Sequence, residues 1–378
     1  MLIQISQRQI HLITLWYLVQ HSLSSFYKLY THYAELEHAY QPDQVPTWQA
    51  LGLHKSHIQR LIKFQLPEEQ NKFQKIILYI QQQCDFLISI EDADYPHQLT
   101  PYADRPPLLM GQGQASALLQ AQIAIVGSRK PSPTGQKTAY DFAYYLAEKG
   151  FYINSGLAQG IDEAAHQGGL MHQRTIAVMG TGLDQTYPSQ HQHLREKILH
   201  AQGAVITEFL PQTPPLQHHF PRRNRIVSAL SLGVIVAEAA LKSGSLITAK
   251  LAAEQGKVVF AIPGHIYSEF HQGCHQLIRD GAILVDHPEQ VIEDLALPTQ
   301  WQHLAQIQAQ AVSPPTTEIP AHLISLYNQI DWVGQSLDQL TLKTSITVAE
   351  LTAQLMELEL LGLVLQQAGC YQRCRPNK

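Results

Sequence analysis

The sequence predicts an α/β protein in which a mostly parallel sheet stands between two helical segments. Between residues 86 and 297, short apolar runs alternate with helical patterns, whereas residues 1–85 and 321–378 show helical patterns almost alone. Strands that alternate with helices are typical of parallel βαβ units, whose sheet is covered on both faces. A chain of 378 residues is long enough for two or three such domains.

Residues 1–85 are expected to form a small helical domain. Apolar residues recur at spacings of three and four in LWYLVQ, SSFYKLYTHYAEL and WQALGLHKSHIQRLIKF, and Gly52 and Pro67 stand at breaks between these stretches. The first residues, MLIQISQRQIHL, lack a basic head followed by a continuous apolar stretch. We therefore expect no signal peptide at this end.

The strands expected within residues 86–297 are rich in Ile and Val and tend to end in Gly, Ser or Pro. They are the runs QIAIVG, FYINSG, TIAVMG, GAVITE, GVIVAEA, KVVFAIPG and AILV. An open parallel sheet binds its ligands at the carboxyl ends of its strands. The turns that follow these runs are therefore the first place to look for a site.

The remaining residues predict a linker and a further small domain. Residues 298–320 contain Pro298, Pro314, Pro315 and Pro320 and show no periodicity, as expected of a linker. In residues 321–378 the helical stretches AHLISLYNQI, SLDQLTLKT and TVAELTAQLMELELLGLV precede a hairpin-like run, VLQQAGCYQR. Helix, helix, helix, hairpin is the order of a winged-helix domain, and its second and third helices have helix-turn-helix spacing.

Composition narrows the classes of function. The net charge is −5 and the pI is near 6.5, so any nucleic-acid binding requires a local basic patch. Cys84, Cys274, Cys370 and Cys374 show no second pair with zinc-ligand spacing, so we expect neither a structural metal nor a disulfide framework. No apolar run is long enough to span a bilayer. We expect a cytoplasmic protein with no cofactor and no membrane partner.

The stretch HHFPRRNRIVSAL concentrates basic and aromatic residues in this acidic chain. Arg222, Arg223 and Arg225 lie within four positions, and Phe220 precedes them. The guanidinium fork suits phosphate oxygens, and an aromatic face can stack an unstacked base. Asn224 would either contact a base edge or pin the arginine segment. We assign phosphate contacts to Arg222 and Arg225 and base stacking to Phe220.

The first glycine-containing turn follows the run QIAIV and consists of Gly127, Ser128 and Arg129. A helix is expected to start near Thr134. A strand, a small-residue turn and a helix N-terminus together present backbone N–H groups to an anion, and Arg129 adds a full charge. The alternative is a tight strand-to-helix connection that carries a surface arginine.

The second turn contains Ser155 and Gly156, and Gly156 and Gly160 frame a segment where the backbone must approach another group. Asp162 is expected to cap the helix that follows rather than to act in catalysis. His166, one helical turn further on, is expected to be structural rather than a metal ligand or catalytic group.

The fourth turn follows the run GVIVAEA and combines small hydroxyl side chains with flanking lysines near a helix N-terminus. Such a turn can hold a phosphate, or it can be a helix cap between two solvated lysines. Glu238 ends the strand before it and is expected to orient donors rather than to catalyse. The expected contacts are Lys242, Ser243, Gly244, Ser245, Thr248 and Lys250.

Two nucleotide-binding fingerprints are absent. The GQKT stretch at residues 135–138 does not have the spacing of a Walker A loop, so ATP binding is not supported. In the third turn, GTGLD at residues 180–184, Gln185 stands where a dinucleotide fingerprint requires its third glycine, which argues against NAD binding.

Six ordered segments together resemble the DNA-processing protein A family (DprA/Smf). They are GSRKPSPTG, SGLAQGIDEAAH, TIAVMGTGLDQTYP, HFPRRNRIVSALS, VIVAEAALKSGSLITAKLAAEQGKVVFAIPG and GCHQLIRDGA, and the resemblance covers roughly residues 86–295. The resemblance implies an extended Rossmann fold that binds single-stranded DNA without strong sequence preference. It also implies protection of incoming strands during natural transformation, loading of the RecA recombinase, and a homodimer. A sterile-alpha-motif-like N-terminal domain and a C-terminal winged-helix domain belong to the same plan.

Three positions depart from the family pattern. Gln159 stands where the family commonly has Arg or Lys, so we assign no DNA contact to it. His275 replaces a common Asn and Ala229 a frequent Gly, which puts local turn geometry in question but not the function.

The sequence argues against two rival functions. Phosphoribohydrolases of the lysine-decarboxylase-like family carry a PGGxGTxxE pattern, but here SGSLIT stands in place of the glycine-rich element even though Glu238 is present. A transcription factor would read DNA with the C-terminal helices, yet TVAELTAQLMELELLGLV is acidic on its polar face and Lys343 is among the few basic residues nearby. A protein–protein role for the C-terminal domain is the better interpretation.

Overall fold

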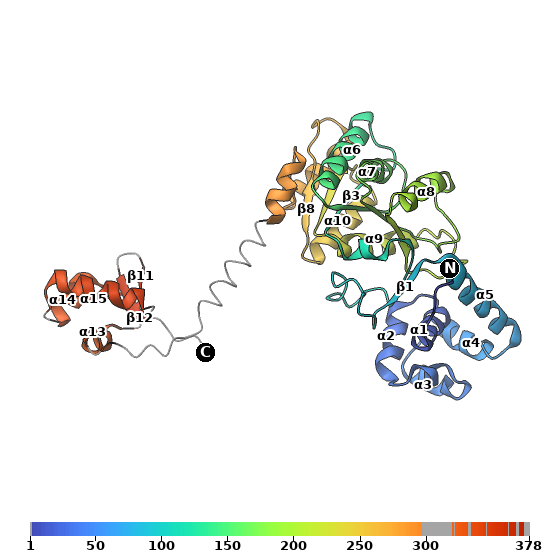
Figure 1. Ribbon diagram of the computed structural model, residues 1–378, viewed down its shortest axis with the longest axis horizontal. Helices are drawn as coiled ribbons and strands as arrows, with labels where there is room; N and C mark the ends of the chain where they lie inside the picture. Colours follow the sequence, from blue (N-terminus) through green and yellow to red (C-terminus); the bar gives the residue numbers. More distant parts are fainter. Residues whose placement is uncertain are drawn as a thin grey trace. The chain divides into compact units, whose positions relative to one another are not determined.

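The computed structural model describes residues 2–296, 320, 322–331, 334–344, 346–361, 363–367 and 370–373 (Figure 1). The chain forms two compact units, Met1–Leu297 and Pro298–Lys378. The expected linker lies outside the described residues except for Pro320, and so does Cys374. Within the part of the chain that the structure describes, no helix combines the length and the apolar character needed to cross a bilayer.

The first 85 residues are helical, as predicted, and they pack directly against the sheet. Trp16, Phe26 and Leu29 share one hydrophobic core with Leu108 and Met110 of a sheet strand. The hydrophobic core is therefore continuous across residue 85. The elements are α1 (Gln7–Leu18), α2 (Leu23–His32), α3 (Val45–Ala50), α4 (Lys55–Lys63) and α5 (Pro67–Gln83), with short 3₁₀ turns at Leu36–Tyr40 and Pro42–Gln44.

A nine-stranded sheet forms the centre of this unit, with strand order β1-β2-β6-β5-β4-β3-β7-β8-β9. The pairs β1–β2 and β2–β6 are antiparallel, and the strands from β6 to β9 are parallel. The strands are β1 (Phe86–Ser89), β2 (Leu108–Gly113), β3 (Gln122–Gly127), β4 (Tyr152–Ser155), β5 (Thr175–Val178), β6 (Ala204–Thr207), β7 (Gly233–Glu238), β8 (Val258–Ala261) and β9 (Ile283–Leu284).

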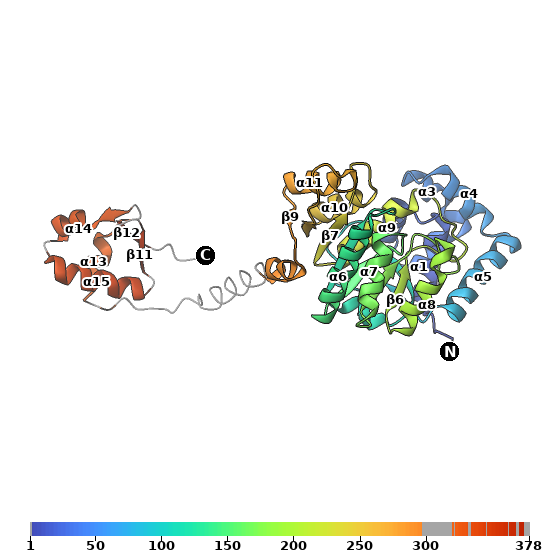
Figure 2. The ribbon, with the colours of Figure 1, turned by 90° about the horizontal axis from the view of Figure 1, so that it is seen from above.

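Helices cover both faces of the parallel strands, as the pattern of apolar runs predicted (Figure 2). Because side chains alternate along a strand, Ile123 and Ile125 of β3 pack under α6 and α7, while Ala124 and Val126 pack under α9 and α10. The helices are α6 (Pro133–Glu148), α7 (Ile161–Leu170), α8 (Gln192–His200), α9 (His219–Leu230), α10 (Ser245–Glu254) and α11 (Gln272–Arg279), and 3₁₀ turns lie at Ala115–Leu119, Ser189–His191 and Glu269–His271.

The chain leaves β3 in one direction through α6 to β4, and β7 lies on the other side of β3. The strand order therefore reverses between β3 and β7. In open α/β sheets, the loops at such a point diverge and leave a crevice outside the carboxyl ends of the strands. The first, second and fourth turns of the sequence lie at these strand ends.

The second unit is a winged-helix domain, as the order of its segments predicted. Its core contains Leu326, Leu340, Leu355 and Val364. Helices α13 (Ile324–Gln329), α14 (Leu337–Thr344) and α15 (Val348–Leu360) pack with the small sheet of β10 (Gln335–Ser336), β12 (Cys370–Arg373) and β11 (Val364–Gln367), in that strand order.

Candidate nucleic-acid-binding site

A cleft of about 820 Å³ opens at the carboxyl ends of β3, β4 and β7. It brings together residues from the first, second and fourth turns and from α9. The predicted site residues that line it are Gly127, Ser128, Arg129, Gly156, Phe220, Asn224, Lys242, Ser243, Gly244, Ser245 and Thr248. Segments up to 122 positions apart in sequence, from Val126 to Thr248, thus form one surface at the switch point of the sheet.

The first turn is held from behind by Glu238, which is fully buried. Its backbone oxygen accepts the Ser128 N–H at 2.7 Å, and its carboxylate accepts the N–H and the hydroxyl of Ser132 at 2.9 and 2.5 Å. The Ser132 hydroxyl in turn accepts the Gly135 N–H and so caps α6. Glu238 therefore orients the turn, as we expected, while the Arg129 side chain stays exposed to solvent.

The second turn is organised by Asp162, whose predicted role was wrong in detail. Its carboxylate accepts the N–H groups of Gly156 and Ala158 at 3.0 and 3.4 Å, and the N-cap of α7 is Gly160, whose φ is +81°. Asp162 thus closes the turn instead of capping the helix. Burial raises the pKa of Asp162, while Arg223 and the two N–H groups lower it.

Arg223 lies behind the second turn and reaches the cleft from α9. Its guanidinium donates to the carbonyl of Val178, and its side chain faces Asp162. Burial lowers the pKa of Arg223 to about 10, so it keeps its charge at neutral pH. A β-carbon on Gly156 would collide with this guanidinium, which explains why this position is a glycine.

His166 is structural, as expected. It is fully buried; its Nδ1 lies 2.7 Å from the Thr175 hydroxyl, and its Nε2 accepts the Leu157 N–H at 3.3 Å. The Leu157 carbonyl in turn accepts from Nδ1 of His191 at 2.9 Å. Burial lowers the pKa of His166 to about 3, so the ring is neutral and acts as an acceptor for this turn.

Phe220 offers a half-buried aromatic face inside the cleft. The Arg129 guanidinium lies 5.6 Å from its ring centroid, and the ring of Tyr187 lies 5.2 Å away at a tilt of 40°. Tyr187 also lines the cleft and is 44% exposed. A cation and two aromatic rings therefore stand side by side, which suits a phosphate and an adjacent unstacked base.

The fourth turn carries the start of α10. The hydroxyls of Ser243 and Ser245 lie 2.7 Å apart, and α10 begins at Ser245, so the positive end of the helix dipole lies at the cleft. Lys242 is exposed at the rim. The cleft as a whole contains four cationic side chains, from Arg129, Lys130, Arg223 and Lys242, and one carboxylate, from Asp162. It is a local basic surface on a protein of net charge −5.

The structure does not place Arg222 and Arg225 in the cleft. Both pair with Glu208, a fully buried carboxylate: Arg222 donates two hydrogen bonds of 3.0 and 2.9 Å, and Arg225 donates one of 2.6 Å. The Arg222 guanidinium also lies 5.3 Å from the Trp16 ring centroid. Residues three apart share one helix face, so these two arginines turn away from the face that carries Phe220 and Asn224. Their contacts are those of packing, and their assignment to phosphate is corrected accordingly.

Two further predicted residues also lie apart from the lining. Ser155 is fully buried, and its hydroxyl donates to the Ile125 carbonyl at 2.7 Å, so it joins β4 to β3. Lys250 is 78% exposed on α10 and lies 3.8 Å from Glu254. Conversely, the cleft includes Lys130 and Tyr187, which sequence reasoning did not select although both follow strands that end at the same edge.

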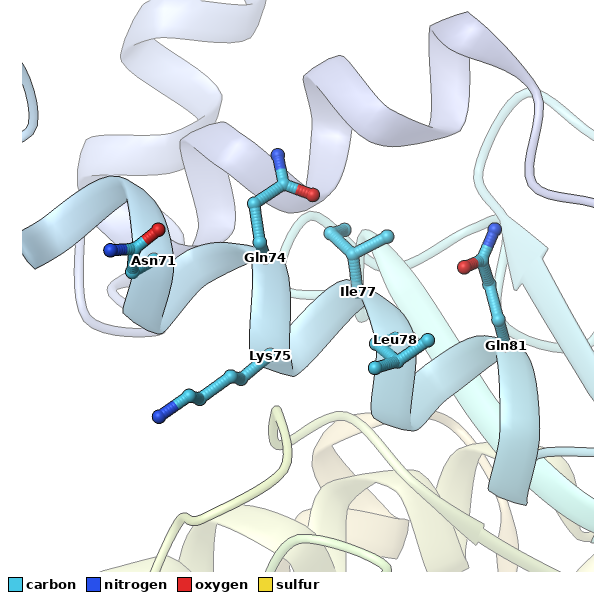
Figure 3. Close-up of a pocket in the computed structure, with 6 residues that line it drawn as sticks. All are labelled: Asn71, Gln74, Lys75, Ile77, Leu78 and Gln81. Atoms are coloured by element: carbon cyan, nitrogen blue, oxygen red, sulfur yellow. The ribbon is translucent and has the colours of Figure 1, made fainter. Parts of the chain in front are cut away.

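A second pocket, of about 450 Å³, lies along α5 and carries little chemistry (Figure 3). Its lining comes from one helix, and Lys75 is its one charged side chain. The set is Asn71, Gln74, Lys75, Ile77, Leu78 and Gln81. We therefore place the functional site at the sheet edge.

The fold and the cleft define a class of protein, namely an α/β protein with a basic cleft at the switch point of its sheet. Comparison with known proteins gives the family. Residues 86–296 match the family model for DNA recombination-mediator protein A, and residues 309–370 match the DprA winged helix domain. The chain belongs to the DNA-processing protein A (DprA/Smf) family.

Relatives and solved structures agree with this assignment. The chain is 38% identical to protein Smf of Escherichia coli K12 over 86% of each chain, and 45% identical to DNA processing protein DprA of Streptococcus pneumoniae over 54% of this chain and 73% of that one. The X-ray structure of the S. pneumoniae protein superposes with a TM-score of 0.63 at 35% identity, over 77% of this chain and 98% of that one. DNA processing protein A of Helicobacter pylori, described as binding single-stranded DNA, superposes with a TM-score of 0.51 at 30% identity, over 56% and 96%.

Proposed function

We propose that this protein binds and protects single-stranded DNA during natural transformation and promotes loading of the RecA recombinase onto it. The cleft is the DNA site. The observation that carries the proposal is the adjacency of Arg129, Phe220 and Tyr187, which offers a phosphate contact and base-stacking surfaces within one cleft. The single-stranded DNA binding reported for the H. pylori relative supports it.

Each part of the cleft has a role in the proposed binding. Arg129, Lys130 and Lys242 contact successive phosphates and release counterions. The serines of the fourth turn and the start of α10 donate hydrogen bonds to phosphate oxygens. Phe220 stacks a base, a contact worth roughly 1–3 kcal/mol. The Asn224 amide makes no hydrogen bond within the described residues, which favours a base-edge contact over pinning of the helix.

In the proposed function, the protein acts by binding DNA and not by catalysis. The phosphoribohydrolase alternative would need a free carboxylate at the end of β7, but the Glu238 carboxylate is buried and occupied by Ser132. Incubation of the protein with nucleoside monophosphates is expected to release no free base. Release of base at a rate that depends on Glu238 would favour the enzyme.

The proposal is tested by titrating single-stranded and blunt duplex DNA of equal length at several salt concentrations. Single strands are expected to bind much more tightly, because only an unpaired base can lie on Phe220. Equal affinity for both at about 150 mM salt, a physiological ionic strength, would refute the stacking role. Light scattering tests the proposed homodimer, and RecA filament formation on coated single strands, with and without this protein, tests the loading step.

A further inference from the structure

Helix α15 of the winged-helix domain carries two apolar stripes, and the described residues of its own domain cover only one of them. The inner stripe consists of Leu351, Leu355 and Leu358, at spacings of four and three. All three are fully buried in the core of this unit. A helix of a small domain normally needs just this one stripe, with polar residues on the opposite face.

The outer stripe consists of Ala349, Ala353, Met356 and Leu360, at spacings of four, three and four. At about 100° per residue, these four positions fall within an arc of about 60° directly opposite the inner stripe. All four are exposed; Met356 is 60% and Leu360 is 87% accessible. Within the described residues of this unit, no other element covers them.

Carboxylates border the outer stripe on both sides. Glu350 and Glu357 lie along one edge and Glu359 along the other, and α15 contains no Lys or Arg. Glu357 lies 3.1 Å from His322, and Glu359 accepts the Gln366 N–H at 3.4 Å, so both stay at the rim of the stripe. An alternating four–three apolar stripe with charged flanks is the surface that one helix offers another in a coiled coil.

The charge of this face decides among possible occupants. In a helix-turn-helix protein the third helix enters the major groove, but here the carboxylates would repel DNA phosphates. A second copy of α15 would bring glutamates against glutamates. We propose that the outer stripe of α15 docks an amphipathic helix of a partner protein whose apolar stripe is flanked by Lys and Arg. This surface belongs to the second unit, whereas the cleft belongs to the first, and the inference goes beyond the proposed function.

The test uses the full chain and three synthetic helical peptides of about 21 residues, or three heptads. All three carry Leu at the a and d positions, and the flanking e and g positions carry Lys, Glu or Ser. The Lys-flanked peptide is expected to bind most tightly, and more weakly as salt rises. The M356E/L360E variant is expected to lose at least about tenfold in affinity for it. The matched control is Met171→Glu, since Met171 is also 60% exposed but lies in the other unit; it should bind as the wild type does.

A charge reversal sharpens the result. The E350K/E357K variant is expected to prefer the Glu-flanked peptide. Equal binding of the Lys- and Ser-flanked peptides, or no effect of the M356E/L360E variant, would overturn the proposal. Loss of duplex-DNA affinity in the M356E/L360E variant would show instead that the outer stripe binds DNA. Loss of self-association in this variant would show instead that the outer stripe is a contact between copies of the chain. The affinity for single-stranded DNA is measured in every variant and should not change. Failure of the docking proposal is then distinguishable from failure of the proposed DNA binding at the cleft.

Discussion

The salt dependence of single-strand binding should report on Arg129 directly. Arg129, Lys130 and Lys242 are the exposed cations of the cleft, whereas Arg223 is buried against Val178 and Asp162. Each phosphate contact on a single strand contributes roughly −0.7 to the slope of log affinity against log salt, so three contacts give about −2. Affinity should then fall about 20-fold between ~50 and ~200 mM salt. With two contacts left in Arg129→Ala, the slope should be about −1.4 and the fall about sevenfold.

Fluorescence anisotropy with a labelled oligothymidylate at four or five salt concentrations measures this slope. Arg279→Ala is the matched control, because Arg279 is also exposed but lies at the end of α11 outside the cleft lining. Its slope should equal that of the wild type. A wild-type slope in Arg129→Ala, with the thermal midpoint intact, would show that Arg129 does not face the DNA.

Three further predictions concern residues inside the first unit. Glu208→Gln leaves the Arg222 and Arg225 charges without their buried partner, so it should cost about 3–5 kcal/mol of stability and lower the thermal midpoint by roughly 6–20 °C. The control is Glu254→Gln, an exposed side chain on α10, which should cost less than ~0.5 kcal/mol. Equal shifts of the midpoint in the two variants would contradict the packing role of Glu208. Gly156→Ala should displace the Arg223 guanidinium and weaken single-strand binding several-fold in a titration, and unaltered affinity would mean that Arg223 does not shape the cleft. Burial lowers the pKa of His166 and His21 from 6.5 to about 3. Between pH 7 and pH 5 the unfolded chain therefore binds more protons than the folded chain, and each of these histidines should lower the free energy of unfolding by about 2 kcal/mol over that interval. Calorimetry that finds no fall in the thermal midpoint from pH 7 to pH 5 would refute these assignments.

The positions of the turns could be predicted from the sequence because a parallel sheet imposes them. The carboxyl ends of parallel strands meet at one edge, so the turns after QIAIVG, FYINSG and GVIVAEA had to converge. The sequence also predicted that the backbone approaches another group at Gly156 and Gly160, and a β-carbon there would collide with the Arg223 guanidinium and the Ser128 carbonyl, respectively. The order of the helices in the C-terminal unit could also be predicted, because the spacing of apolar residues along a helix is a local property of the sequence.

The roles of the three arginines on α9 could not be predicted in the same way. The local sequence does not distinguish them, but they lie on different faces of α9: Arg223 lies toward the cleft, whereas Arg222 and Arg225 lie toward Glu208. Glu208 precedes them by at least 14 residues and follows β6, which lies three places from β3 in the sheet. Only the tertiary fold brings that carboxylate against α9. A buried carboxylate that pairs with two arginines is a long-range feature with no local signal.

The same distinction between neutralised and available charge explains how an acidic protein can bind a polyanion. Arg222 and Arg225 are the most conspicuous cations in the sequence, yet both pair with Glu208, and Arg225 also lies 3.7 Å from the Asp104 carboxylate. Arg129, Lys130 and Lys242 are less conspicuous in sequence, but none has an ion-pair partner in the described residues, and their field acts on the cleft. The acidic residues of α15 lie on the other unit, at the rim of an exposed apolar stripe. On the two proposals made above, these two signs of charge select different partners: phosphates at the sheet edge, and a basic helix at the winged-helix domain.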